Sequence, residues 1–318
     1  MSKVSIVTVT YNSEHYIHDY LESVIELLTN NKDYSLIIVD NDSKDKTVDI
    51  INTAFSNSAL SDQCVIHSQH TNAGFGSGCN TGVKVSELYK PEYIWFLNPD
   101  TIISEQSANA LLNTIETKHV NIAGSYLKDE NSIIRAGGFR FPLLLNVISS
   151  HLSLGIFDRI FPKSRTTYPV SKEPHLVEWA TGSSFMIKKD LFNKLNGFDE
   201  RYFLYFEEVD LFLRANRENE YTMIVPDSVV YHISGASTGV SNKSMRINRL
   251  PSYWFESRRR FYVKNFNKWF FTMVDFTVIC SISLNYLKCL LKRENSQTAP
   301  NYIKDILKHS VLNIDSLK

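Results

Sequence analysis

The stretch Leu36-Ile37-Ile38-Val39-Asp40-Asn41-Asp42-Ser43 joins an apolar run to an acidic turn. The aliphatic residues predict a short buried strand, with Asp40 at its carboxyl end. Residues 93–97 repeat this pattern, because Asn98-Pro99-Asp100 follows them. In an open α/β sheet, ligands bind outside the carboxyl ends of the strands. We therefore expect Asp40 and Asp100, which are far apart in sequence, to converge on one site.

Strand-like and helix-like segments alternate along the chain, which predicts an α/β fold with a mixed, mostly parallel, Rossmann-like sheet flanked by helices. The predicted strands cover residues 4–10, 36–39, 64–67, 93–97, 177–187 and 221–230. The predicted helices cover residues 15–28, 46–55, 104–117 and 189–195, together with a helix that follows the glycine-rich turn of 72–82 and ends near 89. Residues 141–174 keep no period and are interpreted as a long insertion or a flap over the site.

The C-terminal part differs in character, so we expect a catalytic domain over 1–240 and a C-terminal helical, membrane-proximal extension over 241–318. Residues 269–291 are largely apolar, but Asp275, Asn285 and Lys288 interrupt them. A run of about 20 apolar residues is long enough to cross a bilayer. A charge inside that run favours a helix lying in the membrane interface over a true span. A packed structural helix is the remaining alternative.

Composition excludes several classes of protein. The 318 residues carry 34 Lys+Arg and 34 Asp+Glu, and this balance lacks the basic excess of nucleic-acid-binding proteins. The four cysteines have neither metal-ligand spacing nor disulfide-rich density, which fits a reducing compartment. The first residues form a short strand pattern without the apolar core of a signal peptide. We therefore expect a cytoplasmic enzyme.

The run from Gly197 to Arg214 places Glu207, Glu208 and Asp210 among aromatic residues. Crowded carboxylates in apolar surroundings raise one another's pKa, which suits a general base. Asp210 and Arg214 are four residues apart and would pair on a helix, which favours a structural role for Asp210. The alternative for the whole cluster is an amphipathic helix with a solvated acidic face.

The other candidates each carry an alternative structural reading. Asp40 can accept a hydrogen bond from a pyrimidine N3–H or a ribose hydroxyl, whereas Asp40 or Asp42 would otherwise cap the next helix. The glycines of 72–82 either let the backbone approach a ligand or form a tight turn, which leaves the side chains of Asn72 and Asn80 as candidates.

A divalent cation is expected at Asp100, because Mg²⁺ and Mn²⁺ prefer oxygen ligands and bridge diphosphate oxygens. His232 follows the apolar run 224–231 and is a candidate third metal ligand beside Asp100. The alternatives are a proline turn with a capping Asp and an ordinary, satisfied histidine.

These segments together resemble the inverting glycosyltransferases of family 2, which have the GT-A fold, over residues 1 to about 240. The resemblance rests on residues 8–12, 39–43, 72–76 with Asn80, 98–100, 181–184, 197–200, 207–210 and His232. Among the subgroups, the chain is similar to the rhamnosyltransferase-like enzymes of bacterial surface polysaccharide synthesis. Galactofuranosyltransferases look similar as well.

The resemblance implies roles by position. Asp100 matches the last Asp of the family's metal motif, in which Asn98 replaces the first Asp, and His232 matches a metal-binding His. Glu208 stands where the family usually has a catalytic Asp, so Glu207 remains an alternative base. The implied donor-binding residues are Thr10, Tyr11, Asn12, Asp40, Asn72, Gly74, Phe75, Gly76, Asn80, Asn98 and Asp100. The implied acceptor-binding residues are Trp179, Thr181, Gly182 and Asp199.

The resemblance also implies a reaction. A sugar, L-rhamnose from dTDP-rhamnose, would pass with inversion and with the help of Mg²⁺ or Mn²⁺ to a saccharide or lipid-linked oligosaccharide at the inner face of the plasma membrane. The product would serve O-antigen, capsule or cell-wall synthesis. The alternatives are transfer of galactofuranose from UDP-galactofuranose and a catalytically inactive nucleotide-sugar-binding homologue. A nucleotidyltransferase would need a basic glycine-rich loop near the N-terminus, and residues 9–13 do not form one.

Overall fold

The computed structural model describes residues 2–56, 60, 62–129, 131–135, 137–152, 155–232, 248–294, 296 and 298–310. The chain forms two compact units. The sheet unit comprises Met1–Phe139, Pro169–Phe203 and Glu207–Ser237, and the helical unit comprises Arg140–Tyr168, Leu204–Phe206 and Thr238–Lys318. This division differs from a single boundary after residue 240, because residues 140–168 from the middle of the chain pack with the C-terminal helices.

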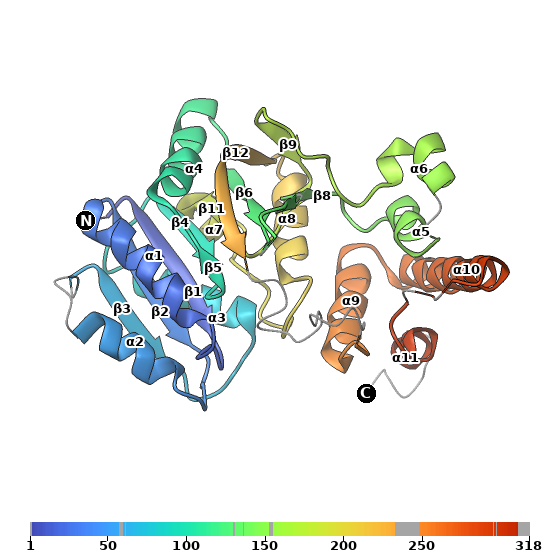
Figure 1. Cartoon of the computed structure of the whole chain (residues 1–318), viewed down its shortest axis with the longest axis horizontal. Coiled ribbons are helices and arrows are strands. Elements are labelled where there is room, and N and C mark those ends of the chain that lie inside the picture. Colours follow the sequence, from blue (N-terminus) through green and yellow to red (C-terminus); the bar gives the residue numbers. More distant parts are fainter. Residues whose placement is uncertain are drawn as a thin grey trace. The chain divides into compact units, whose positions relative to one another are not determined.

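A ten-stranded sheet is the framework of the sheet unit, with the strand order β3-β2-β1-β4-β11-β6-β12-β5, and β7 and β9 paired to β6 and β12 (Figure 1). Its strands are β1 (Val4–Thr10), β2 (Tyr34–Asp40), β3 (Cys64–Ser68), β4 (Tyr93–Leu97), β5 (Thr101–Ile102), β6 (Ile122–Lys128), β7 (Ile134–Arg135), β9 (His175–Val177), β11 (Ser184–Lys188) and β12 (Thr222–His232). A separate pair joins β8 (Gly138–Phe139) to β10 (Trp179–Ala180). Strands β1 to β4 run parallel, and β11 is antiparallel to both of its neighbours. The predicted mixed, mostly parallel sheet is confirmed.

Helices cover both faces of this sheet. They are α1 (Ile17–Asn30), α2 (Thr47–Ser56), α3 (Phe75–Ser86), α4 (Glu105–Lys118), α7 (Lys189–Lys194) and α8 (Glu207–Arg217). Alternation along each strand divides the core: Ile6 and Trp95 pack with residues of α1 and α4, such as Tyr20 and Leu111. On the other face, Phe96 contacts the aromatic rings of Phe185, Phe192 and Phe198, with ring centroids 5.0–5.3 Å apart.

Helix α3 lies close against β1 because glycines face the strand. A Cβ on Gly82 would stand 2.4 Å from Val7 Cγ1, and a Cβ on Gly78 would stand 2.7 Å from Val9 Cγ1. These two positions are one turn apart on α3, so they form a groove that receives the valines. Helix packing therefore accounts for these two glycines of the 72–82 segment.

Two expectations about strands need correction. The strand predicted over 177–187 is three short pieces, because a turn over 181–183 separates β10 from β11. Strand β6 lies between β11 and β12 and was not predicted at all. Its apolar run is broken by Gly124 and Ser125, yet both are needed there. A Cβ on Gly124 would meet Ala180 Cβ at 2.7 Å, and the Ser125 hydroxyl bonds the buried hydroxyls of Ser184 and Ser228 at 2.8 Å each.

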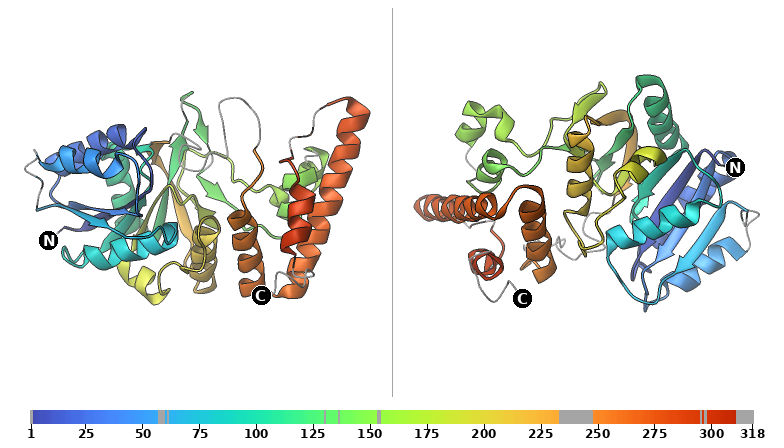
Figure 2. Two further views of the ribbon diagram at one scale, coloured as in Figure 1. Left: turned by 90° about the horizontal axis from the view of Figure 1, so that it is seen from below. Right: turned by 180° about the vertical axis from the view of Figure 1, so that it is seen from behind.

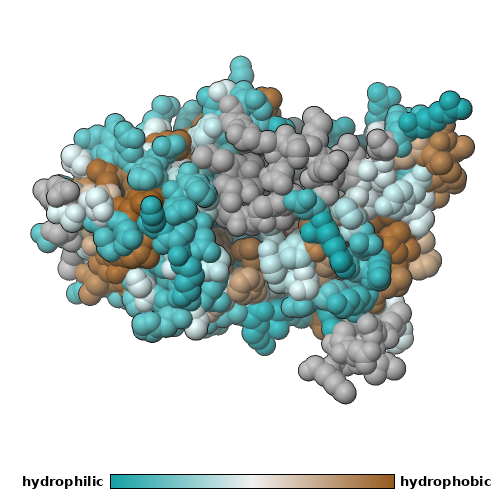
Figure 3. Space-filling view, turned by 60° about the horizontal axis from the view of Figure 1, so that its bottom comes forward, coloured by the Kyte–Doolittle hydropathy of each residue, from teal (hydrophilic) through white to brown (hydrophobic). Residues whose placement is uncertain are grey.

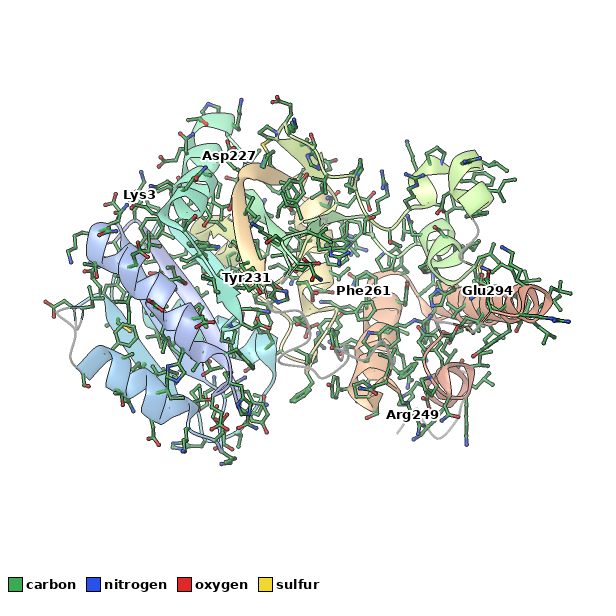
Figure 4. The ribbon with its side chains drawn as sticks, viewed as in Figure 1. Lys3, Asp227, Tyr231, Arg249, Phe261 and Glu294 are labelled. Carbon is green, nitrogen blue, oxygen red and sulfur yellow. The ribbon has the colours of Figure 1, made fainter. Side chains whose placement is uncertain are left out.

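The helical unit contains α5 (Leu144–Leu152), α6 (Gly155–Ile160), a 3₁₀ turn (Pro162–Ser164), α9 (Ser252–Asn265), α10 (Lys268–Lys292) and α11 (Tyr302–His309), arranged as in Figure 2. The insertion predicted over 141–174 is therefore partly helical. The core of the helical unit holds a buried ion pair between Arg258 Nη1 and Asp275 Oδ1, 2.6 Å apart. A second pair joins Arg249, marked in Figure 4, to Asp305 at 2.6 Å.

Helix α10 is the one helix, among the described ranges, that is long and apolar enough to cross a membrane by length and composition. Residues at a spacing of three or four on one side are buried against the rest of the unit: Phe271, Val274, Asp275, Val278, Ile282, Asn285 and Cys289. Asp275 and Asn285, predicted to interrupt an apolar run, thus belong to the buried side of this helix.

Candidate active site

The carboxyl ends of β1, β2 and β4 meet at one edge of the sheet, as the sequence predicts for parallel strands. Thr10 and Asp40 are register partners at the ends of β1 and β2, and the Thr10 hydroxyl donates to Asp40 Oδ1 at 2.9 Å. Asp40 is 2% exposed. Ser43 donates both its backbone N–H, at 2.9 Å, and its hydroxyl, at 2.5 Å, to the same carboxylate. Asp40 therefore fixes the loop that follows β2.

The loop after β1 is tied to the loop after β2. The backbone N–H of Asn12 donates to the Ser43 hydroxyl at 2.9 Å, and Asn12 Oδ1 accepts from the N–H of Lys44 at 2.8 Å. Both Asn12 and Asp42 have positive φ, a conformation that Asn and Asp adopt more easily than most residues. Tyr11, directly before Asn12, is 46% exposed. Asp45 lies two residues before the start of α2, and its Oδ1 accepts from the Thr47 N–H at 3.0 Å.

The glycine-rich segment that begins at Asn72 lies beside the loop after β2 at this edge of the sheet. Asn72 Oδ1 accepts from the N–H of Gly74 at 3.0 Å, and the Asn41 amide donates to the Gly74 carbonyl at 3.0 Å. Gly74 has φ 95°, and a Cβ there would lie 2.2 Å from the Phe203 carbonyl oxygen. The N–H of Phe75 donates to that carbonyl at 3.1 Å, so only glycine fits at 74.

Asn80 and Gly76 connect α3 to the segment that precedes α8. The Asn80 amide donates to the Phe198 carbonyl and to Glu200 Oε1, both at 2.9 Å, and its oxygen accepts from the Phe198 N–H. A Cβ on Gly76 would lie 3.1 Å from Phe198 Cβ. The side chain of Asn80 thus already makes hydrogen bonds within the protein through both its nitrogen and its oxygen. The predicted contact of Asn80 with the sugar donor would require some of these hydrogen bonds to break.

Asp100 and His232 meet at the same edge. Asp100 follows β4, His232 ends β12 one residue after Tyr231 (labelled in Figure 4), and Asp100 Oδ1 lies 3.4 Å from His232 Nε2. The Ser183 hydroxyl lies 3.3 Å from His232 Nε2 and accepts from the Asn98 amide at 3.4 Å. The turn over 181–183 therefore joins β4 to the end of β12.

The adjacent carboxylates Glu207 and Glu208 open α8 and face different surroundings. Glu207 is 3% exposed and packs toward α3, where its Cβ is 3.7 Å from a Cβ built on Gly76. The Cβ of Glu208 is 3.6 Å from a Cβ built on Gly182. The residue Glu208 is half-buried, but its Oε2, like that of Glu207, is buried without a hydrogen-bond partner in the described part of the chain.

Burial is the main cause that raises the pKa of both carboxyls. The pKa of Glu207 stands well above its ordinary value, because burial and the neighbouring Glu208 charge disfavour ionisation. Burial also raises the pKa of Glu208, although backbone N–H groups at the start of α8 oppose the shift. Of the two, Glu208 faces the turn that carries Ser183, on the side of Asp100 and His232.

The family model described as glycosyl transferase family 2 matches residues 5–210. The chain belongs to glycosyltransferase family 2. It is 25% identical over 248 residues to N-acetylglucosaminyl-diphospho-decaprenol L-rhamnosyltransferase of Mycobacterium tuberculosis, covering 74% of this chain and 77% of that protein. It is 27% identical over 270 residues to rhamnosyltransferase WbbL of Escherichia coli K12, covering 81% of this chain and 94% of that protein.

Solved structures show the same fold. The S. aureus TarS fragment 1–349 in complex with UDP-GlcNAc superposes with a TM-score of 0.55 at 16% identity, over 99% of this chain and 83% of that one. The predicted GT-A architecture with C-terminal helices is thus confirmed. Family 2 membership establishes a glycosyltransferase, and it supports a nucleotide-sugar donor.

Within this family 2 enzyme, Asp210 is structural, as its spacing from Arg214 predicted. Asp210 is fully buried, accepts from Arg214 Nε at 2.8 Å and accepts from the Tyr202 hydroxyl at 3.2 Å. Arg214 also donates to the Gly197 carbonyl at 2.8 Å. This network fastens α8 to the loop before it.

The predicted acceptor residues lie in three different surroundings. Thr181 and Gly182 lie in the turn beside Glu208, where the Thr181 hydroxyl donates to Ser183 Oγ at 3.2 Å. Trp179 stacks on Phe139 with ring centroids 4.5 Å apart. Asp199 pairs with the exposed Arg201 at 2.8 Å.

The donor set at Asp100 and His232 fits a divalent cation that takes its remaining ligands from a diphosphate and water. A carboxylate oxygen and an imidazole nitrogen 3.4 Å apart are close enough to share one ion. Within the described ranges there is no group of three or more His, Cys, Asp or Glu residues that could hold a metal. Mg²⁺ is commonly bound by one or two protein groups plus substrate phosphates, so two residues suffice.

Two residues of this site escaped the prediction. Ser43 holds Asp40, and Ser183 bridges Asn98 and His232. Both stand inside motifs that were recognised, Asp40 to Ser43 and Thr181 to Ser184, so their position was the available signal. A serine in such a motif carries no charge or spacing that marks it as a bridge.

Proposed function

We propose that this chain is an inverting rhamnosyltransferase that moves L-rhamnose from dTDP-rhamnose to a saccharide or lipid-linked oligosaccharide in bacterial surface polysaccharide synthesis. The two rhamnosyltransferase relatives, which match over three quarters or more of their length, support rhamnose as the transferred sugar. One observation carries the proposal: the turn over 181–183 contacts both Glu208 and the His232 that lies beside Asp100. A base and a diphosphate-binding pair therefore flank one turn.

Glu208 is the proposed general base. Its carboxylate faces Gly182, whereas Glu207 packs toward α3. A base with a raised pKa holds a proton more strongly than an ordinary carboxylate, which brings it closer to the pKa suited to neutral pH. Glu208 is one methylene longer than the usual Asp, so the acceptor hydroxyl sits slightly further from α8.

The reaction is a single displacement. Glu208 takes the proton of an acceptor hydroxyl, and that oxygen forms a bond to the anomeric carbon. The bond from this carbon to the diphosphate oxygen breaks, and the electron pair leaves with the nucleoside diphosphate. Because attack and departure occur on opposite faces of the sugar, the anomeric configuration inverts. General-base assistance of this kind contributes about 10²- to 10⁴-fold in rate.

Asp100 and His232 are the proposed ligands of Mg²⁺ or Mn²⁺. A bound cation of this kind neutralises negative charge on the departing diphosphate. Asp40, held by Thr10 and Ser43 at the neighbouring strand end, is the proposed contact to the pyrimidine or ribose. The orientation of Asp40 is fixed before a donor binds, which lowers the entropy lost on binding.

We further propose that the enzyme works at the cytoplasmic face of the plasma membrane and rests on it through α10. The exposed side of this helix carries two groups of large apolar residues, Trp269, Met273 and Phe276 near its start and Leu284, Leu287 and Leu291 near its end. Exposed Lys268 and Lys292 stand at its two ends, and exposed Arg293 follows. Figure 3 shows apolar surface gathered at the right-hand end of the view, where α10 lies.

An anionic lipid surface is the occupant that matches this face. An apolar stripe flanked by cations buries its side chains among acyl chains while its lysines contact lipid phosphates. A true span would bare the opposite side of α10, where Asp275 is paired with Arg258. Exposing a carboxylate to the bilayer centre is costly, so the helix lies along the interface.

The donor and metal proposals are tested together by calorimetric titration with dTDP-rhamnose and UDP-galactofuranose, each with Mn²⁺ and with EDTA. We expect dTDP-rhamnose to bind in Mn²⁺ and to bind much more weakly in EDTA. Asp100→Ala should abolish the difference between the two conditions. A preference for UDP-galactofuranose would overturn the donor, and equal affinity in Mn²⁺ and EDTA would overturn the metal role.

A further inference from the structure

The segment 140–168, which belongs to the helical unit, has an excess of positive charge. Its four Lys or Arg residues are Arg140, Arg159, Lys163 and Arg165, and its single acid is Asp158. The chain as a whole is balanced, with 34 Lys+Arg and 34 Asp+Glu. Arg159, Lys163 and Arg165 are exposed, and none of the three forms an ion pair within the described ranges. A local excess of exposed cations indicates an anionic partner.

The single acid of this segment is held inside it. Asp158 Oδ1 accepts from the Ser149 hydroxyl at 2.5 Å and from the Ser164 hydroxyl at 3.1 Å. Ser164 is fully buried, and Asp158 itself is only partly exposed. The carboxylate therefore joins α5 to the 3₁₀ turn after α6, and the exposed charge of the segment is carried by its cations.

Helix α6 presents apolar side chains beside these cations. Ile156 is 66% exposed and Ile160 is 64% exposed, and Phe161 directly after the helix is 46% exposed. Residues three and four apart are neighbours on a helix, so Ile156, Arg159 and Ile160 share one face. We call Ile156, Arg159, Ile160, Phe161 and Lys163 the α6 face. Exposed apolar residues that gather in this way mark an interaction surface.

The α6 face is held in place by contacts within the helical unit. The amide of Asn146 on α5 donates to the carbonyls of Lys163 at 2.9 Å and Ser164 at 3.2 Å. The rings of Phe157 and Phe161 lie 5.1 Å apart between their centroids. A surface that is already ordered loses little conformational entropy when a partner binds.

The α6 face lies near the second apolar group of α10. Helix α5 packs against α10 (Figure 1), and Lys288 Nζ of α10 donates to the Leu152 carbonyl at 3.5 Å. Helix α6 begins three residues after Leu152, and three residues span at most about 11 Å. Lys288 directly follows Leu287, so the start of α6 lies close to the exposed leucines at the end of α10.

We propose that the α6 face is a second membrane-contacting element, which binds an anionic phospholipid surface together with α10. This inference rests on the proposed function, since α10 is proposed to rest on the membrane. Isoleucines can enter the acyl boundary while neighbouring cations contact lipid phosphates. A second copy of the chain fits less well, because a two-fold contact would bring the same cations together. Two contacts in one unit strengthen binding without a new contact in either.

Vesicle co-sedimentation of the full chain tests the two properties of the α6 face separately. Ile156→Glu/Ile160→Glu should lower binding to phosphatidylglycerol vesicles by at least about tenfold, because two apolar side chains no longer leave water. Arg159→Gln/Lys163→Gln should lower it by about 10- to 30-fold, the effect of two cations at an anionic surface. Binding of this charge variant to uncharged phosphatidylcholine vesicles should equal that of the wild type.

Matched controls come from exposed residues of the sheet unit. Leu88→Glu/Leu176→Glu makes the same apolar-to-acidic change, and Lys46→Gln/Lys118→Gln removes the same charge. Both should bind phosphatidylglycerol vesicles within about twofold of the wild type if the effect belongs to the α6 face. Variants of the α6 face that bind as their controls do would overturn the inference. A dimer in solution that Ile156→Glu/Ile160→Glu dissociates would assign the face to a second copy and would also overturn it.

Hydrogen exchange separates this inference from the proposed function. Phosphatidylglycerol vesicles should slow amide exchange in the peptides over 155–163 and 284–292 and leave the peptides of β1 and β2 unchanged. The measurement needs no donor, so it is independent of whether the enzyme transfers rhamnose. Protection confined to 284–292 would overturn the α6 contact and leave the α10 proposal standing. Protection of neither peptide would overturn both membrane contacts, even in an active transferase.

Discussion

Glu207 and Glu208 are adjacent in sequence, but their side chains lie in different surroundings and are assigned different roles. Both are acids of the same length at the start of one helix, but Glu207 packs toward α3 and Glu208 faces the turn at Gly182. Their order along a helical turn, about 100° apart, points them in different directions. The buried Glu207, whose Oε2 has no hydrogen-bond partner among the described residues, is expected to reduce the stability of the fold once it ionises.

A pH-dependent stability measurement tests this expectation. The pKa of Glu207 is raised in the folded state, so its stabilising contribution is complete below the ordinary value of 4.5 and is lost as pH rises through the folded pKa. The free energy of unfolding of the wild type should therefore decline with rising pH more steeply than that of Glu207→Gln. Urea denaturation between acidic and alkaline pH measures both slopes. The control is Glu22→Gln on the exposed side of α1; identical slopes in the two variants would contradict the prediction.

At the scale of elements, α3 can pack close to β1 because its glycines have no side chain on the face toward the strand. Gly82→Ala should lower the free energy of unfolding by about 1–3 kcal/mol, because the new methyl group would meet Val7 and force α3 away from β1. Gly155→Ala is the matched control, since a Cβ there meets nothing within 4 Å. Better helix propensity should make the control neutral or more stable by up to about 1 kcal/mol. Urea unfolding that gives both variants the same sign would refute the packing argument.

The same scale shows what the sequence could predict. The strands β1, β2 and β4 and the helices between them follow clean apolar patterns, so they and the carboxyl-end site were predictable. Asp100 and His232 were also predicted to lie at one site, and His232 Nε2 lies 3.4 Å from Asp100 Oδ1. Strand β6 was missed, because Gly124 and Ser125 serve close packing and a buried hydroxyl network that leaves no periodic trace. The positive φ of Tyr205 (69°) and Phe206 (67°) was equally hidden, since no residue type there signals that conformation.

At the scale of the whole molecule, the α10 surface predicts where the enzyme works. The full-length protein should float with phosphatidylglycerol vesicles, and high salt should weaken the association because the flanking lysines are screened. Leu284→Glu/Leu287→Glu should reduce binding by at least about tenfold, since burying one leucine is worth about 1.5–3 kcal/mol. Leu88→Glu changes a 72% exposed leucine outside α10 and should bind as the wild type does. A wild-type protein that stays unbound, or that instead dimerises through α10, would contradict the membrane proposal.

Single-turnover transfer by Glu208→Gln, compared with Glu207→Gln and the wild type, tests the central claim most directly. Rhamnose transfer from dTDP-rhamnose and donor affinity are measured on the same preparations. We predict that Glu208→Gln binds the donor as tightly as the wild type and transfers about 10²- to 10⁴-fold more slowly, while Glu207→Gln keeps most of the rate. A Glu208→Gln enzyme that keeps most of its turnover, with the loss found instead in Glu207→Gln, would contradict the assignment of the base.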